Sequence, residues 1–350
     1  MYKPSEYSLD PISQGAIGAG FAQTLQRKEK ILAVTWLGCA AGMAPDLDVL
    51  IQSPTDPLLF LEFHRHFTHA LIFIPFGAAI VAGALFWFVR HRLSFKESYL
   101  ACLIGYATHG LLDACTSYGT QLFWPFSDMR VAWNNVSVVD PAFTLPLLIL
   151  VILGYRRQDL RFTYAGIAWV VFYLSLGWVQ MERASAYTYQ VAASRGHEAS
   201  DISQLSMKPS FGNLLLWKSI YHHDGRYYVD AIRTGLDVQL CVGDSVEKLV
   251  ISKHLPDLQP GTQQAKDLER FRWFSQDYLA LTGTPGEVTD MRYSTIPNQV
   301  EPMWGITLNP NADPTEHVRW WSRRDVSGGM WAEFGSLMQG EGCSPLQQNE

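Results

Sequence analysis

Hydrophobic residues are concentrated in the first half of the chain, in runs long enough to form membrane-spanning helices. Residues 70–89 contain no charged side chain, and a helix of about 20 apolar residues crosses the hydrocarbon core of a bilayer. Three further apolar stretches follow at 98–116, 142–155 and 162–181. The pattern therefore predicts an α-helical, polytopic membrane domain.

Two shorter segments precede these runs, at residues 11–26 and 31–43, and both are rich in Gly and Ala. Small residues allow close packing between membrane helices. We interpret the pair as a short or re-entrant helical hairpin, which brings the total to about six helices. The alternative is that both are amphipathic helices lying on the membrane surface.

Basic residues cluster in three of the connecting loops, around positions 27–30, 90–96 and 156–161. Loops rich in Lys and Arg remain in the cytoplasm, so we expect all three on that side. Residues 45–68, residues 117–141 and everything after 181 then lie on the opposite side. No cleavable signal-peptide pattern is present. We expect a multi-pass protein of the bacterial inner membrane, with its C-terminal domain in the periplasm.

Residues 182–350 have a different pattern, with short aromatic and β-branched runs such as 227–229 and 237–242 separated by Gly and Pro. One amphipathic helix is expected at 262–281. It places three apolar residues at helical spacing, namely Leu268, Phe271 and Phe274. The prediction is a helical membrane domain over 1–181 followed by a soluble, β-rich α+β domain.

Composition narrows the classes of partner. A formal net charge of -6 without a long basic block argues against nucleic acid. The five cysteines include no C-x-x-C pair, so no thiolate zinc site is predicted. Cys241 and Cys343 could form a disulfide if their domain lies outside the cytoplasm, and the sequence leaves that pairing open.

Four groups of polar residues interrupt the apolar segments, and the predicted topology brings all four to one membrane face. The groups are Asp10 with Gln14, Asp46 with Asp48, His64 with His66 and His69, and His109 with Asp113. Residues four apart lie on one helix face, so His109 and Asp113 can contact a single ion. Since a lone membrane histidine commonly makes an interhelical hydrogen bond, the convergence is the stronger argument for a metal site.

Imidazole and carboxylate donors suit zinc, with manganese and iron as alternatives. The expected metal ligands are Asp46, His64, His69, His109 and Asp113, and the expected catalytic residues are Asp48 and Asp113, with Asp48 as general base toward a metal-activated water. Further candidates are Asp10, Gln14, His66, Asp128 and Asp140. Alternatively, Asp46 and Asp48 only cap a turn, and Arg65 with His66 are interfacial anchors.

Several of these motifs, in this order, resemble a known family. The segments are DPISQGAIGA, APDLD, FHRHFTHAL and GYATHGLLDACTSYGTQLFWPFSD. They are similar to the bacterial inner-membrane metal-dependent hydrolases, also described as LexA-binding, inner membrane-associated hydrolases. The resemblance implies that Asp46, His64, His69, His109 and Asp113 are the signature polar positions. Many members have His where this chain has Gln14, and His66 occupies a position that is often small.

The sequence thus predicts a membrane-bound metal-dependent hydrolase in which water attacks an ester or phosphodiester of a lipid or lipid-linked substrate. A site at the lipid–water boundary favours an amphiphilic substrate, so membrane lipid is the expected partner. The alternative is a non-enzymatic membrane scaffold or a metal-binding or transport protein. A carrier would distribute ionisable residues along a path through the membrane, whereas here they gather at one face.

Overall fold

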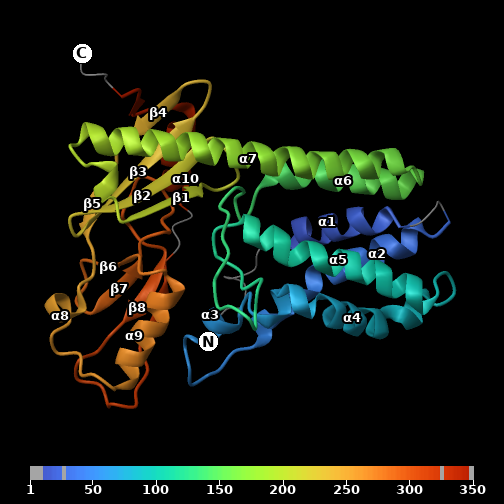
Figure 1. The fold of residues 1–350 in the computed structure, drawn as a ribbon, viewed down its shortest axis with the longest axis horizontal. Coiled ribbons are helices and arrows are strands. Elements are labelled where there is room, and N and C mark those ends of the chain that lie inside the picture. The colour runs from blue at the N-terminus through green and yellow to red at the C-terminus, as the bar shows by residue number, and fades with distance from the viewer. Residues whose placement is uncertain (1–10, 26–28, 324–326, 347–350) are drawn as a thin grey trace. The chain divides into compact units, whose positions relative to one another are not determined.

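The computed structural model describes residues 11–25, 29–323 and 327–346, which form two compact units. The helical unit comprises the described residues up to Ile51 together with Glu62–Trp178 and Phe211–Asn213. The β unit comprises Gln52–Leu61, Val179–Ser210 and the described residues from Leu214 onward. The predicted order, a helical half followed by a β-rich half, is confirmed (Figure 1).

Helices form in all six segments that the hydrophobic pattern predicted. They are α1 (Pro11–Gln23), α2 (Ile31–Met43), α4 (Ile74–Val89), α5 (Phe95–Cys115), α6 (Pro141–Arg157) and α7 (Leu160–Ser194). Shorter elements lie between α2 and α4, namely η2 (Ala44–Leu50), α3 (Leu59–Phe63), η3 (Phe67–His69) and η4 (Leu71–Phe73). Glycines allow α1 and α2 to pack closely, since a Cβ on Gly18 would lie 2.4 Å from the carbonyl oxygen of Gly38.

Within the described residues, two helical segments are long and apolar enough to cross a bilayer, Leu71–Val89 and Leu160–Ser194. The prediction of a polytopic domain of about six helices, with the first two short or re-entrant, is therefore only partly supported. α1 and α2 have 13 residues each, which is about 20 Å of helix against a hydrocarbon core of about 30 Å. α5 is longer but carries Lys96, Glu97, His109 and Asp113, which lower its hydropathy.

The helices of this unit run back and forth, so that the α1–α2, α4–α5 and α6–α7 connections lie at one end, on the right in Figure 1. Lys30, at the start of α2, forms an ion pair with Glu97 in the first turn of α5, with 2.5 Å between Nζ and Oε1. Ser94 and Glu97 form a capping box at that helix start. The described basic residues of the three predicted loops thus share one end of the unit.

Two antiparallel sheets make up the β unit. The larger has the order β1-β2-β3-β4-β10, with β5 paired to β3, and the smaller has the order β6-β7-β8-β9. The strands of the larger sheet are β1 (Gln204–Pro209), β2 (Leu216–His223), β3 (Arg226–Thr234), β4 (Val238–Cys241), β5 (Ser245–Glu247) and β10 (Cys343–Ser344). Those of the smaller are β6 (Leu279–Leu281), β7 (Glu287–Asp290), β8 (Trp304–Thr307) and β9 (Arg319–Ser322).

Three helices complete this unit, α8 (Ile251–His254), α9 (Gln263–Phe274) and α10 (Gly328–Gln339). α9 is the amphipathic helix expected at 262–281, and its Leu268, Phe271 and Phe274 are buried as their spacing predicted. It ends earlier than expected, because Gln276 and Asp277 have positive φ and turn the chain into β6.

The predicted domain boundary after residue 181 falls inside α7, which continues without a break to Ser194. Residues beyond the apolar run keep a helical pattern of burial, with Ala184, Thr188 and Val191 packed inside the β unit. Thr188 Oγ1 lies 2.9 Å from Ser219 Oγ on β2. The helix therefore persists because its second half has its own partner in the sheet.

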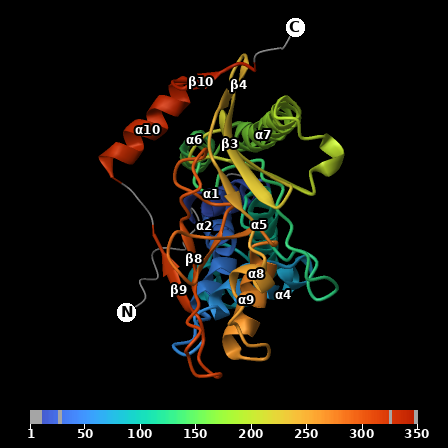
Figure 2. The ribbon, with the colours of Figure 1, turned by 90° about the vertical axis from the view of Figure 1, so that its left-hand side faces the viewer.

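Cys241 and Cys343 form a disulfide in the β unit, between paired residues of β4 and β10. Figure 2 shows these two strands beside each other, with α10 leading into β10. The sequence had left this pairing open. The other three cysteines, Cys39, Cys102 and Cys115, are free.

Candidate metal centre

His109 and Asp113 lie one turn apart on α5, as their spacing predicted, with His109 Nε2 3.5 Å from Asp113 Oδ2. His109 Nδ1 lies 2.6 Å from the carbonyl oxygen of Gly42 near the end of α2. A carbonyl only accepts hydrogen bonds, so this contact places the proton of a neutral ring on Nδ1. Nε2 then presents a lone pair toward Asp46 and Asp113.

His69 ends η3, and its Nδ1 lies 2.9 Å from Thr68 Oγ1 and 3.2 Å from Asp48 Oδ2. Its Nε2 faces the same point as His109 Nε2, and the two nitrogen atoms are 2.9 Å apart. Burial opposes protonation of this ring, but the neighbouring Asp113, Asp46 and Asp48 carboxylates raise the pKa of His69 well above its ordinary value. The local field therefore attracts positive charge to this point.

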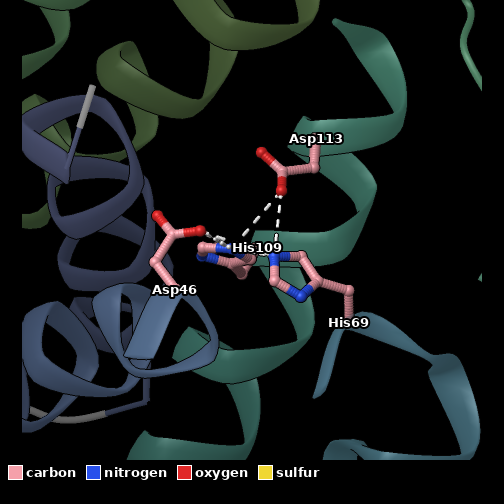
Figure 3. A group of neighbouring side chains, drawn as sticks. All are labelled: Asp46, His69, His109 and Asp113. Atoms are coloured by element: carbon pink, nitrogen blue, oxygen red, sulfur yellow. Dashed lines mark hydrogen bonds and ion pairs between the residues drawn. The ribbon is translucent and has the colours of Figure 1, made fainter. Parts of the chain in front are cut away.

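Four donor atoms surround the point, Asp46 Oδ1, His69 Nε2, His109 Nε2 and Asp113 Oδ2 (Figure 3). Besides the two distances above, His69 Nε2 lies 3.1 Å from Asp113 Oδ2 and 3.5 Å from Asp46 Oδ1, and His109 Nε2 lies 3.3 Å from Asp46 Oδ1. Ligands at about 2.1 Å from a tetrahedral zinc ion are about 3.4 Å apart. Five of the six distances between these donor atoms, from 2.9 to 3.5 Å, are close to that value.

Two of these atoms, Asp46 Oδ1 and Asp113 Oδ2, are buried without a hydrogen-bond partner. Buried carboxylate oxygens are costly unless they are paired or bind a cation. The side chains of His69, His109 and Asp113 are at most 1% exposed, whereas that of Asp46 is 19% exposed. The residues present therefore fit a divalent cation, with access from the side of Asp46.

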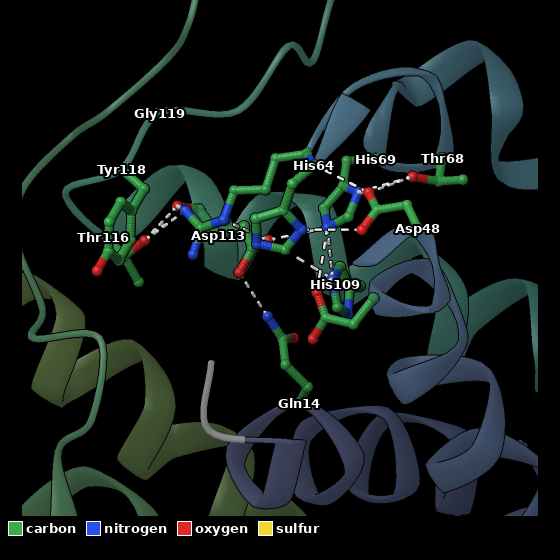
Figure 4. Close-up of polar contacts among 12 residues, drawn as sticks. Gln14, Asp48, His64, Thr68, His69, His109, Asp113, Thr116, Tyr118 and Gly119 are labelled. Atoms are coloured by element: carbon green, nitrogen blue, oxygen red, sulfur yellow. Dashed lines mark hydrogen bonds and ion pairs between the residues drawn. The ribbon is translucent and has the colours of Figure 1, made fainter. Parts of the chain in front are cut away.

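Asp48 lies next to this donor set, and both of its oxygens are engaged (Figure 4). Oδ1 lies 2.8 Å from His64 Nδ1, and Oδ2 accepts from the backbone N–H of Arg65 and from Thr68 Oγ1, each at 2.9 Å. Burial opposes ionisation, but the hydrogen bonds with His64 and His69 outweigh it and hold the pKa of Asp48 well below its usual range. Its contacts orient His64 and His69.

His64 therefore stands apart from the other predicted ligands. It is grouped with Asp46 and Asp48, whose donor atoms also lie within 4.8 Å of one another, but its Nδ1 is held by Asp48. The ring of His64 lies 6.1 Å from that of His69, centroid to centroid. The structure places His64 at the edge of the centre.

Arg65 is a residue whose role sequence reasoning missed. Its side chain is fully buried, in contrast to the interfacial anchor considered above. The guanidinium Nε lies 3.2 Å from Asp113 Oδ2, and Nη1 donates to Thr116 Oγ1 at 2.8 Å. Three aspartates at one site require countercharge, and this surplus of negative charge is the sequence signal that could have identified Arg65.

Gln14, on α1, donates from Nε2 to Asp113 Oδ1 at 2.8 Å. The contact leaves Oδ2, the other oxygen of the same carboxylate, facing the histidines. Gln14 and Asp113 also line a small cavity together with Ser13, Thr116, Ser137 and Asp140. Gln14 thus supports the donor set through its hydrogen bond to Asp113.

The remaining candidates are not brought into the donor set. The His66 ring packs against Phe63, Phe67 and Trp124, and Asp128 is exposed. Asp140 caps α6 and accepts a hydrogen bond from Tyr173, so its contacts are structural although it lines the cavity. Asp10 lies outside the described residues.

The described residues thus combine candidate membrane-spanning helices with a His/Asp donor set that could hold a metal ion. Residues 9–184 match the model of the family described as YdjM inner membrane protein, and the chain belongs to this family, which confirms the resemblance. The Bacillus subtilis (strain 168) protein described as "Uncharacterized protein YfhP" is 28% identical over 125 residues, which is 36% of this chain and 38% of that protein. No solved structure matches the chain.

Proposed function

We propose that the chain is a metal-dependent hydrolase that cleaves an ester or phosphodiester of a lipid or lipid-linked substrate. The observation that carries the proposal is the convergence of two imidazole nitrogens and two carboxylate oxygens on one largely buried point. Membership of an inner membrane family supports a substrate that resides in the membrane.

Asp46, His69, His109 and Asp113 would hold the ion. Two nitrogen and two oxygen donors at near-tetrahedral spacing favour zinc, and manganese or iron are alternatives. Such an ion, when bound, lowers the pKa of a coordinated water to about 7 and polarises the bond to be cleaved. Thr68 and Asp48 fix the His69 ring, Gly42 fixes the His109 ring, and Gln14 fixes Asp113.

We further propose that the centre opens toward the periplasm and that the β unit lies in the periplasm. Two observations support this orientation. The described basic residues of the connecting loops lie at the end of the helical unit opposite α5's His109 and Asp113. The β unit contains a disulfide, and disulfides persist in oxidising compartments such as the periplasm.

The test is metal analysis of the full-length protein, purified in detergent without chelators, followed by assays on lipid-like carboxyl esters and phosphodiesters. Wild type should carry a stoichiometric transition metal. The His69→Ala and His109→Ala proteins should lose this metal and, with it, the hydrolytic activity. Their loss of metal affinity should exceed the roughly 10- to 100-fold loss that follows removal of an outer hydrogen-bond partner of a metal ligand.

His91→Ala is the matched control, because His91 is exposed and lies in the α4–α5 connection at the other end of the unit. A His109→Ala protein with the metal content of wild type would contradict the proposal. So would a wild-type protein that binds no metal, in which case a membrane scaffold becomes the better assignment. Full metal binding without hydrolysis of any ester would favour a metal-binding or transport protein.

A further inference from the structure

The turn between β3 and β4 exposes an apolar side chain at one end of the larger sheet. β3 ends at Thr234 and β4 begins at Val238, and Leu236 at the tip is 102% exposed, so it touches almost nothing in the β unit. Leu215, in the neighbouring β1–β2 connection, is 39% exposed, and its carbonyl oxygen accepts a hydrogen bond from Thr234 N at 2.6 Å. Two leucines thus face outward from the same end of the sheet.

The second half of α7 lies against this turn. Gln180 Nε2 donates to the carbonyl oxygen of Thr234 at 2.8 Å. Arg183 Nη2 donates to the carbonyl oxygens of Gly235 and Leu236 at 3.0 and 3.1 Å. These hydrogen bonds hold the turn beside residues 180–183 of α7.

That level is where α7 changes from apolar to polar. Residues 162–181 contain no charged side chain, and Glu182 and Arg183 are the first charges after them. An arginine at the end of an apolar helical run is typical of the membrane–water interface. The exposed Leu236 is therefore held at the depth at which a bilayer crossed by α7 would begin.

We propose that the β3–β4 turn dips into the lipid–water interface of the bilayer that α7 crosses, with Leu236 as its inserted side chain. Backbone carbonyls cannot remain unpaired at membrane depth, and Arg183 pairs the two carbonyls at the tip. Transfer of the exposed leucine out of water is favourable. Asp237, exposed next to it, limits the insertion to the interface.

The proposal can be tested with an environment-sensitive fluorophore on single introduced cysteines, using full-length protein reconstituted in phosphatidylethanolamine–phosphatidylglycerol vesicles. Cys39→Ser removes the free cysteine that is only partly buried. Three positions are compared, Leu236→Cys at the turn, Phe172→Cys on the exposed apolar face of α7, and Ala193→Cys on the same helix. Ala193 lies ten residues beyond Arg183, about 15 Å further along the helix axis.

The Leu236 label should show an emission between those at Phe172 and Ala193, quenching by nitroxide-bearing lipid, and less quenching by aqueous iodide than at Ala193. An emission and an iodide response equal to those at Ala193 would overturn the proposal. Protection from both iodide and nitroxide lipid would also overturn it, because the turn would then be covered by protein, such as a second copy of the chain.

Discussion

His69 Nε2 and His109 Nε2 lie 2.9 Å apart, although the two residues come from different elements. Each ring has an acceptor near its Nδ1, the carbonyl of Gly42 for His109 and the carboxylate of Asp48 for His69. In the neutral state both Nε2 atoms therefore carry lone pairs. Two lone pairs at this distance repel unless a proton or a cation lies between them, so this contact, with Asp46 Oδ1 and Asp113 Oδ2 beside it, marks a point that suits positive charge.

Asp48 is expected to act through its orientation of His69. Asp48→Asn should weaken metal affinity by about 10- to 100-fold, as is usual for the outer partner of a ligating histidine, while turnover per bound metal stays near that of wild type. Competition with a fluorescent chelator measures the affinity, and assays at saturating metal measure the turnover. Asp128→Asn is the control, because Asp128 is an exposed carboxylate away from the donor set.

The original prediction that Asp48 is the general base gives the opposite result in the same experiment. A general base contributes roughly 10²- to 10⁴-fold to the rate, so its loss would reduce turnover even at full metal occupancy. Lost turnover with unchanged metal affinity would therefore support that assignment and contradict the orienting role.

Gln14 supports the donor set through one hydrogen bond to Asp113 Oδ1. Gln14→Ala should lower metal affinity by about 10-fold, at the lower end of the range for outer partners, because Asp113 loses the contact that directs its other oxygen. Isothermal titration with zinc measures the change. Gln23→Ala, a buried glutamine on the same helix that binds Thr163 and Val151, should leave the affinity unchanged, and an equal loss there would show a general loss of α1 packing instead.

Arg65 is fully buried and forms an ion pair with the buried Asp113. Removing one partner of a buried ion pair costs about 3–5 kcal/mol, so Arg65→Gln should markedly lower the melting temperature in detergent. Arg65→Lys should recover little of this loss, since an ammonium cannot reproduce the separate Nε and Nη1 contacts to Asp113 and Thr116.

The exposed Arg92 provides the control for that experiment. Arg92→Gln should change stability by no more than about 0.5 kcal/mol, as is typical of surface substitutions. An Arg65→Gln protein with the melting temperature of wild type would show that the buried guanidinium contributes no net stability.

The sequence predicted the helices and the convergence of polar residues for physical reasons that need no tertiary detail. Uncharged runs identify apolar helices, and the loop charges alone placed residues near 46, 69 and 109 on one face. α1 and α2 were also expected to be short, and close contacts such as that between Gly18 and Gly38 explain their small residues.

The distinction between donor and supporting residue could not be predicted, because it depends on which atom of each side chain faces the centre. Asp46 and Asp48 are two residues apart, yet one has an unpaired oxygen in the donor set and the other is saturated with hydrogen bonds. His66 turns toward aromatic rings although it lies between His64 and His69. The length of α7 was also underestimated, since its polar second half is stabilised by packing on β2.

The Cys241–Cys343 disulfide gives a test of the compartment of the β unit. If this unit is periplasmic, the denatured but unreduced protein should react with a maleimide at three cysteines only, Cys39, Cys102 and Cys115, and at all five after reduction. A cytoplasmic unit would expose five thiols without reduction. Cys343→Ser should lower the stability of the β unit by about 4–5 kcal/mol, because the bridge closes a loop with a sequence separation of 102 residues. Cys39→Ser, which removes one reactive thiol and leaves the bridge intact, is the control for both measurements.

Reporter fusions test the same topology independently. A reporter fused at Arg92 should report the cytoplasm, and a reporter fused at Gly225 should report the opposite side of the membrane.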